Sequence, residues 1–371
     1  MKPTQILASL LLIALPVLAQ GAADEIVLAD GKVIDRIRIT SESYTEIAYR
    51  TSRGIDRKQP AAEVERVVYA RSSPEFSDGM AKLGTPAWAD GVGKLLLAAT
   101  DEDLDDFKRA TALAHAASAL LDAGYYGDAE ANFGQLLADY RNSRHRPAAL
   151  LGQAKALLNQ ERFAEAEDLL RTLQSESGSK GYAAKWPHEA EFLLLLSAEA
   201  GGKDADEILS GYKDLRLLTQ GEFEGIANKC ALRIGRLMFS QNPPDLRGAS
   251  QLFDEIIEGR LETDRDVVAG AYNGLGRVHF MRGQQALTKS DPETAREELE
   301  AALLSFLRVH VSYDQISSEQ PEALYWAAQS FRSLAPLGGG GQEADLNGRR
   351  LLFTLRDRYP NSPWALQAAN E

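Results

Sequence analysis

The sequence predicts a mainly α protein, an α-solenoid of helical hairpins that follows a small all-β module. One observation is a pattern that occurs twice between residues 112 and 173: a small residue follows an aromatic or large apolar residue by three positions and precedes another by four. The two copies are Tyr126, Ala129 and Phe133, then Phe163, Ala166 and Leu170. On a helix this phase puts the three side chains on one side, where the small residue lets a second helix approach. The other observation is that strand-like segments occur only before Ser72.

The small residue of this pattern recurs and marks the second helix of each predicted pair. The markers are Gly91, Ala129, Ala166, Ala205, Ala249, Ala302 and Gly348. Their intervals of 38, 37, 39, 44, 53 and 46 residues are typical of repeats that bury their apolar face only by stacking on neighbours. Residues 72–371 are therefore expected to form about seven helical pairs. An insertion at Gln284–Thr294 is expected to be a surface loop, and the glycine run 338–341 a connector.

Three segments of this region resemble the tetratricopeptide repeat. They are Gly124, Tyr126, Ala129 and Phe133; Tyr272, Leu275 and Gly276 within AYNGLGRVHF; and Tyr359-Pro360 within RDRYPNSPWA. The resemblance covers the chain from about Pro74 to its end. This region is similar to the divergent repeats of secreted envelope proteins whose helices end in YPxS. The resemblance implies a solenoid whose groove binds a protein or a peptide.

Residues 24–71 are predicted to form a small barrel. Asp30-Gly31 joins two stretches of alternating hydrophobicity, which indicates a hairpin, and the break in alternation near Asp35 indicates a bulge. Pro60 to Glu63 reads as one helical turn before a last strand from Val64. So few residues cannot bury two sheets, and a closed barrel is the economical solution. The pattern resembles SH3-like or Sm-like small barrels, and Ser72-Ser73-Pro74 is expected to be a hinge after it.

Residues 1–23 are predicted to be a signal peptide. Lys2 precedes an apolar run, Ile6–Leu15, which ends at Pro16 and is followed by small residues that allow cleavage after Ala19 or Ala23. The run is about half of the ~20 residues that a membrane span needs, and no lipidation cysteine follows it. We therefore expect an exported, soluble protein of the periplasm or the extracellular space, with no integral membrane span.

The charge distribution disfavours nucleic acid as a partner. The net charge is −13, and residues 24–71 carry equal numbers of acidic and basic side chains, so the negative excess lies in the helical region. A negative surface repels phosphates and keeps a solenoid soluble.

The sequence contains no recognisable arrangement of catalytic, cofactor-binding or metal-binding residues. Its histidines are His115, His145, His188, His279 and His310, and no two stand at metal-ligand spacing. Cys230 lies in an apolar helical pattern and is interpreted as a small buried side chain. The segment from Gly91 to Leu96 lacks the first glycine and the Ser/Thr of a phosphate loop, and Asp101–Asp106 is interpreted as a solvated helix start, with Asp101 or Asp103 as its cap.

Candidate partner-binding residues are polar side chains expected on the concave faces of first helices. They are Lys155, Asn159, Arg233, Arg236, Asn273 and Arg277. The three arginines are positive groups in an acidic region, and the carboxylate of a peptide could use them. The alternative interpretation is that they are ordinary surface arginines.

The sequence therefore predicts a non-catalytic exported scaffold or adaptor that binds a protein or peptide partner, and a role in assembly or maintenance of the cell envelope is expected. Two alternatives stay open at this point. One is an enzyme or enzyme subunit whose site is built from insertions, in which His279, Glu297 and the Gln284–Thr294 loop would converge. The other is a structural spacer that self-associates.

Overall fold

The computed structural model describes residues 23–70, 72–259, 264–338 and 341–370. The predicted signal peptide lies almost wholly outside these residues. The chain divides into two compact units, Met1–Pro187 and His188–Glu371, and each is described by itself. The predicted segments 1–23, 24–71 and 72–371 divide the sequence at other places and stay a prediction.

The first unit begins with an antiparallel sheet of five strands. They are β1 (Asp24–Leu28), β2 (Val33–Glu42), β3 (Glu46–Thr51), β4 (Asp56–Pro60) and β5 (Val64–Val68), and a 3₁₀ turn (Ala61–Glu63) precedes β5. The predicted hairpin is confirmed, because Gly31 has φ 82° between β1 and β2. The predicted bulge is also confirmed: the pairing of β1 with β2 shifts between Ile34 and Ile37, and Arg36 has φ 56°. The helical turn before β5 lies where it was expected.

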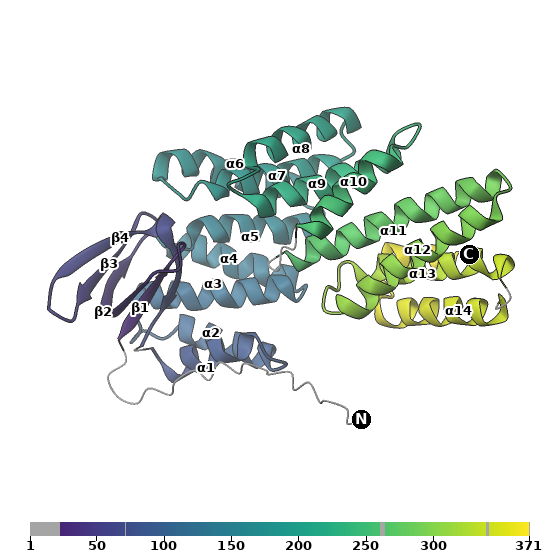
Figure 1. The fold of residues 1–371 in the computed structure, drawn as a ribbon. Helices are drawn as coiled ribbons and strands as arrows, with labels where there is room; N and C mark the ends of the chain where they lie inside the picture. The colour runs from purple at the N-terminus through teal and green to yellow at the C-terminus, as the bar shows by residue number, and fades with distance from the viewer. Residues whose placement is uncertain (1–22, 71, 260–263, 339–340, 371) are drawn as a thin grey trace, which may run out of the picture. The chain divides into compact units, whose positions relative to one another are not determined.

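The strand order is β4-β3-β2-β1-β5, so β4 and β5 form the two edges of the sheet as its hydrogen bonds define it. Ile26, Ile37, Ile39 and Ile47 are buried in the sheet and belong to one core with side chains of α1–α5. A closed SH3-like barrel stays a prediction, whereas the small all-β module before the helices is confirmed. The sheet lies at one end of α3–α5 (Figure 1).

In the described part of the chain, three helical pairs follow in the first unit and four in the second, which agrees with the predicted solenoid of hairpins. The first unit contains α1 (Pro74–Leu83), α2 (Trp88–Ala99), α3 (Asp106–Asp122), α4 (Tyr126–Asp139), α5 (Arg146–Asn159) and α6 (Phe163–Lys180). The unit boundary falls in the first turn of α7 (Lys185–Ala200). The second unit continues with α8 (Ala205–Thr219), α9 (Glu224–Leu237), α10 (Leu246–Glu258), α11 (Arg265–Thr288), α12 (Pro292–Ser312), α13 (Gln320–Leu334), α14 (Gly341–Arg358) and the short α15 (Pro363–Ala369).

Two expectations about helix ends are wrong. The Gln284–Thr294 insertion is mostly helix, because α11 continues to Thr288 and α12 begins at Pro292 with Asp291 as its cap. The cap of α3 is Asp105, whereas the side chain of Asp101 accepts a hydrogen bond from the Asp103 amide in the preceding turn. None of the helices in the described part of the chain combines the length and the apolar character needed to cross a membrane.

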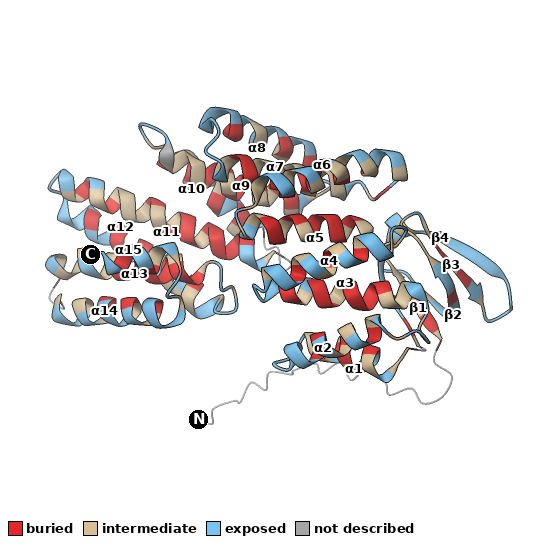
Figure 2. Cartoon of the chain, turned by 180° about the vertical axis from the view of Figure 1, so that it is seen from behind, coloured by how far each residue is buried: buried red, intermediate tan, exposed pale blue. Residues whose placement is uncertain are grey.

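The second helix of every pair buries three positions with the same spacing of four and then three residues. These sets are Gly91, Leu95 and Ala98; Ala129, Phe133 and Leu136; Ala166, Leu170 and Leu173; Ile208, Tyr212 and Leu215; Ala249, Phe253 and Ile256; Ala302, Phe306 and Val309; and Gly348, Leu352 and Leu355. The buried residues form stripes along the helices (Figure 2). Six of the seven predicted markers begin such a set.

Ala205 is the marker that was wrong. It is the first residue of α8, it is exposed, and the side chain of Asp204 caps the helix in front of it. Ile208 holds the marker position instead, and the close approach of α7 to α8 is made at Gly211, where a Cβ would lie 2.5 Å from Leu195 Cδ2. The pattern failed here because the small residue and the first position of the buried set are separate residues in α8.

Glycines on first helices receive the large side chains of second helices. A Cβ on Gly152 of α5 would lie 2.4 Å from Phe133 Cζ, and Cβ atoms on Gly235 and Gly274 would lie 2.6 Å and 2.4 Å from ring atoms of Phe253. Gly276 meets Phe306 in the same way. Close-packed interiors tolerate no extra carbon at such positions without movement, so these contacts set the spacing between helices.

Replacing Ala129 by leucine is expected to lower the free energy of unfolding by about 1–3 kcal/mol, because Ala129 is fully buried and the added carbons overpack the contact of α4 with its neighbours. Ala131→Leu on the exposed face of α4 is the matched control and is expected to have little effect. Chemical denaturation of both variants measures the difference. Equal stabilities would show that the side of α4 that packs inward is misassigned.

Gly152→Ala is expected to destabilise the first unit by about 1–3 kcal/mol, because its methyl group would overlap the Phe133 ring. Gly178→Ala in α6 is expected to have the opposite sign, a gain of about 0.5–1 kcal/mol, because a Cβ there meets nothing within 4 Å and alanine favours the helix. Thermal and denaturant unfolding compare the two variants. If Gly152→Ala left the free energy of unfolding unchanged, the Phe133 ring would not hold the position seen here.

Candidate functional site

Three of the six predicted partner-binding residues come together in the second unit. Arg236 of α9 and Asn273 of α11 both contact Glu319, the residue before α13: Arg236 Nη2 lies 2.7 Å from Glu319 Oε2, and Asn273 Nδ2 donates to the same oxygen at 2.9 Å. Asn273 Nδ2 also donates to the Glu319 carbonyl oxygen at 3.0 Å. Arg277, one turn after Asn273, donates to Glu322 Oε1 at 3.4 Å. We call these five residues the α9–α11–α13 cluster.

The sequence builds this cluster through helix periodicity and one glycine. Asn273 and Arg277 are four residues apart and so share one side of α11. Gly270, one turn earlier, lies against α9: a Cβ there would be 2.8 Å from Leu232 Cδ2 and 3.3 Å from Arg236 Nη2. The absence of that carbon lets α9 and α11 approach closely enough for Arg236 to reach the start of α13.

Burial shifts the pKa values of two members of the cluster. It raises the pKa of Glu322, against the attraction of Arg236, and it lowers the pKa of Arg277, against the attraction of Glu322. The Arg277 guanidinium lies 4.1 Å from the centroid of the Trp326 ring, with Phe239 and Trp364 further out at 5.5 Å and 5.9 Å. Arg277 is thus held as a cation among aromatic rings with one long contact to a carboxylate.

Buried polar atoms without a hydrogen-bond partner are concentrated in this region. Among the described residues these atoms are Arg109 Nε, Asn273 Oδ1, Arg277 Nε and Trp326 Nε1, and three of the four lie in or beside the α9–α11–α13 cluster. Such an atom costs about 1–3 kcal/mol of desolvation. A concentration of them in one place calls for an explanation beyond packing.

Arg233 makes a separate contact on α9. Its Nε lies 3.1 Å from Glu199 Oε2 of α7, and Tyr212 Oη of α8 donates to the same oxygen at 3.0 Å. Burial alone would lower the pKa of Arg233, but Glu199 raises it, so the guanidinium stays charged. Arg233 therefore ties α9 to α7 and α8 and does not join the α9–α11–α13 cluster.

Lys155 and Asn159 lie on α5, in the first unit. Asn159 is exposed, and its Nδ2 donates to the Lys155 carbonyl oxygen at 2.9 Å. Lys155 is half-buried and its charge acts on Asp122, whose pKa is raised by burial and lowered in part by Lys155. The partner-binding role of all six residues stays a prediction.

Sequence reasoning missed the carboxylates that organise the arginines. Glu319, Glu322 and Glu199 carry no motif, and their roles follow from helix packing. The spacing of four between Glu322 and Trp326 puts both on one side of α13, which is the only local signal. The alternative of an enzyme built from insertions required His279 to converge with Glu297, but His279 Nδ1 lies 2.6 Å from Glu298 Oε2 instead. Within the described ranges no three His, Cys, Asp or Glu side chains meet as metal ligands.

A second polar cluster joins the sheet to the helices of the first unit. Arg144 Nε lies 2.5 Å from Glu42 Oε2 at the end of β2, and Tyr69 Oη donates to Glu42 Oε1 at 2.5 Å. Thr111 Oγ1 of α3 lies 3.1 Å from Tyr69 Oη and 3.0 Å from His145 Nε2. We call these five residues the junction cluster; they were not identified from the sequence as a group. Burial lowers the pKa of the neighbouring His115 to about 4, so that this ring is neutral at pH 7.

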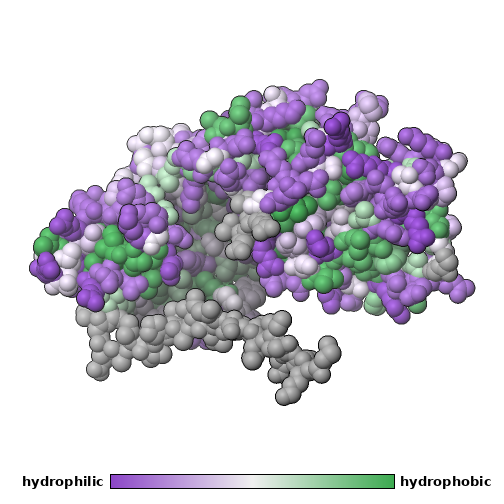
Figure 3. All heavy atoms as spheres, in the orientation of Figure 1, coloured by the Kyte–Doolittle hydropathy of each residue, from purple (hydrophilic) through white to green (hydrophobic). Residues whose placement is uncertain are grey.

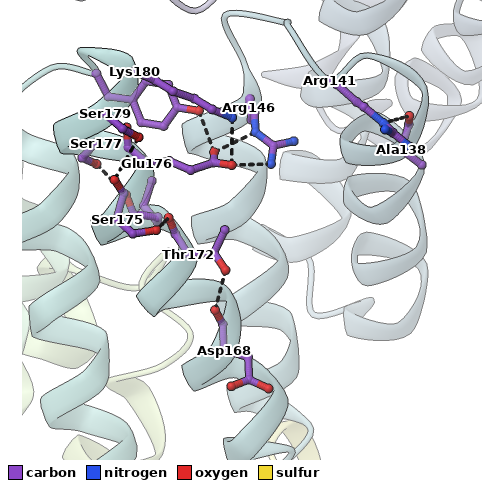
Figure 4. Close-up of polar contacts among 12 residues, drawn as sticks. Ala138, Arg141, Arg146, Asp168, Thr172, Ser175, Glu176, Ser177, Ser179 and Lys180 are labelled. Atoms are coloured by element: carbon purple, nitrogen blue, oxygen red, sulfur yellow. Dashed lines mark hydrogen bonds and ion pairs between the residues drawn. The ribbon is translucent and has the colours of Figure 1, made fainter.

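A third cluster lies between α5 and the end of α6. Arg146 donates from Nε and Nη2 to the two carboxylate oxygens of Glu176, each at 2.8 Å (Figure 4). Lys180 Nζ and Tyr182 Oη also lie 2.8 Å from this carboxylate. The hydrogen bond from Arg146 is the main cause that lowers the pKa of Glu176 to about 2. Such a bidentate pair with added donors favours the ionised carboxylate strongly.

The stability of the first unit is expected to depend on the charge of Glu176. Because its folded pKa of about 2 lies below the usual value of 4.5, the contribution is present above pH 4.5 and is lost as the pH falls through 2. Glu176→Gln should therefore be less stable than the parent at pH 7, and the difference should shrink in acid. Glu165→Gln, which loses an exposed pair with Arg162, is the matched control and should show a smaller difference. Amide exchange of α5 and α6 at a series of pH values measures the stability difference between each variant and the parent. A difference for Glu176→Gln that stays constant with pH would contradict the lowered pKa of Glu176.

Comparisons with known proteins bear on the fold. No family model and no curated protein matches the chain. Among solved structures, the Rap regulator of conjugation genes of plasmid pLS20, in complex with the Phr* peptide, has a TM-score of 0.50 at 12% identity over 76% of this chain and 74% of that chain. The apo quorum sensor NprR from B. thuringiensis has a TM-score of 0.47 at 10% identity, over 75% of this chain and 86% of that one.

A third similar structure is the C-terminal part of a TPR repeat-containing protein from Cytophaga hutchinsonii, with a TM-score of 0.39 at 10% identity over 79% of this chain and 98% of that chain. At such identities the likeness to Rap concerns the fold alone. Together with the helical hairpins described above, it shows that the chain has a tetratricopeptide-like α-solenoid fold behind a small antiparallel sheet.

Proposed function

We propose that this protein is a non-catalytic exported scaffold or adaptor that binds a protein or peptide partner through its first helices, in assembly or maintenance of the cell envelope. The observation that carries the proposal is the α9–α11–α13 cluster, where residues on three first helices converge and buried polar atoms lack partners. The Rap regulator, which has a similar fold, was solved with a bound peptide.

The cluster offers a route for an acidic group of the partner to bind. The contact of Arg277 with Glu322 is long, at 3.4 Å, and burial raises the pKa of Glu322, so this carboxylate is a weak competitor for the guanidinium. A carboxylate from a partner can take its place and form a bidentate pair, while the aromatic rings around Arg277 hold the guanidinium in position.

Self-association is the second candidate. Leu346 and Phe353 of α14 are exposed by 48% and 72%, and their spacing of seven residues puts them on one side of the helix. An exposed apolar pair of this kind on the last long helix could meet a second copy. A mass that rises with concentration, together with no bound partner, would favour this function.

The proposal predicts a partner that touches first helices and depends on Arg277. A photoreactive residue at Asn159 on α5 should crosslink the partner in the cells of origin, whereas the same residue at Gln135, on the exposed side of α4, should not. Arg277→Lys keeps the charge but loses the planar fork, and it should weaken binding of the captured partner by roughly tenfold. Calorimetry with the purified partner measures the change.

Arg216→Lys is the matched control, because Arg216 pairs with Glu255 between two second helices at 2.6 Å. It should leave the affinity unchanged. Circular dichroism establishes that both variants fold, and recovery of the complex from the periplasmic or the secreted fraction tests export. Equal affinities of Arg277→Lys and the parent for the partner would contradict the proposal, as would equal crosslinking of the partner from Asn159 and Gln135.

A further inference from the structure

The first unit contains a cavity of about 620 Å³ between the sheet and the helices. Its walls come from β5, from α1, from α3 and from the starts of α5 and α7. Phe76 and Met80 of α1 supply apolar surface, and Tyr69, Thr111 and His145 of the junction cluster supply a polar wall. A cavity of this size with a few convergent polar groups is typical of a binding site.

Strand β5 presents its edge to this cavity. All five of its residues, Val64–Val68, line the cavity. Successive side chains of a strand point to opposite faces, so a wall made of five consecutive residues consists of the strand edge, where the backbone N–H and C=O groups lie. Among the residues that the structure describes, β5 pairs on one side only, with β1, and is an edge of the sheet. An edge of this kind is a template for an added strand.

The charge of the cavity wall is opposite to that of the chain. The chain carries −13, but the cavity is lined by the cations Arg66, Arg144 and Lys185 and by a single carboxylate, Glu65. Arg144 is paired with Glu42, whereas Arg66 is exposed on β5 itself. With Arg144 offset by Glu42, Arg66 and Lys185 still outnumber Glu65, and low-dielectric walls with an excess of one sign of charge attract ligands of the opposite sign. The cavity is therefore complementary to an acidic ligand.

We propose that an extended acidic segment of a partner chain binds in this cavity as an additional strand beside β5. Its backbone hydrogen-bonds to the free edge of β5, its apolar side chains contact Phe76 and Met80, and its carboxylates face Arg66 and Lys185. This inference concerns the first unit alone and does not depend on the function proposed for the α9–α11–α13 cluster.

The probe is a capped pentapeptide of alternating valine and glutamate, as long as β5. It should bind the full chain, and it should slow amide exchange in β5 and not in the other edge strand, β4. Methylation of its alternate backbone nitrogens removes the donors for strand pairing and should weaken binding by about tenfold or more, as should replacement of its glutamates by lysine.

Arg66→Glu should weaken binding of the acidic peptide by about tenfold and favour the lysine peptide, because it reverses a charge of the cavity wall. Arg57→Glu on β4, which does not line the cavity, is the matched control and should bind like the parent. Both residues are exposed, so both variants should fold.

Three results would overturn the inference. One is failure of the acidic peptide to bind at millimolar concentration. Another is equal binding of the backbone-methylated peptide, which would show that strand pairing is not used. The third is full competition by butyrate with no protection of β5, which would make the cavity a site for small carboxylates. None of these results bears on the Arg277 experiment.

Discussion

The fold depends on one packing constraint, a large side chain of a second helix that lies on a residue without a side chain, or with only a methyl group, on a neighbouring helix. Phe133 on Gly152 and Phe253 between Gly235 and Gly274 are the clearest examples. The contact sets the distance between helices, and the spacing of four and three residues sets which side of each helix is buried. Polar side chains of first helices can then be brought to fixed positions relative to one another.

Polar contacts in both units link helices that are consecutive or next but one in the sequence and, through Glu319, helices farther apart. Glu319 joins Arg236 and Asn273, Glu199 joins Arg233 to Tyr212, and Glu176 collects Arg146, Lys180 and Tyr182. A buried ion pair contributes little net stability because desolvation opposes the attraction, but leaving one partner alone is costly. Such pairs therefore favour one register of the repeats over others. Hydrophilic residues cover most of the face shown in Figure 3, and hydrophobic residues show between them, including over the sheet.

The sheet is an integral part of the first unit. Its isoleucines share a core with α1–α5, and Glu42, Tyr69 and Arg144 bond across the junction, where Tyr69 is almost wholly buried and its pKa is raised chiefly by that burial. These contacts fix β5 relative to α1 and α3. The edge of β5 therefore forms part of the wall of the cavity that these helices also line. The expected hinge at Ser72–Pro74 is bridged by contacts that the sequence does not reveal.

Periodicity was enough to determine the class of fold, the helical pairs, the hairpin at Gly31 and six of the seven marker positions, because each is a local property of spacing and turn chemistry. It failed at Ala205 and at the Gln284–Thr294 insertion, where the helix ends are decided by caps and neighbouring helices. The candidate site was predictable only in part. The sequence singled out Arg236, Asn273 and Arg277. Only tertiary structure decided that Glu319 and Glu322 face them and that the edge of β5 lines a cavity with an excess of cations, because these contacts join residues far apart in the chain.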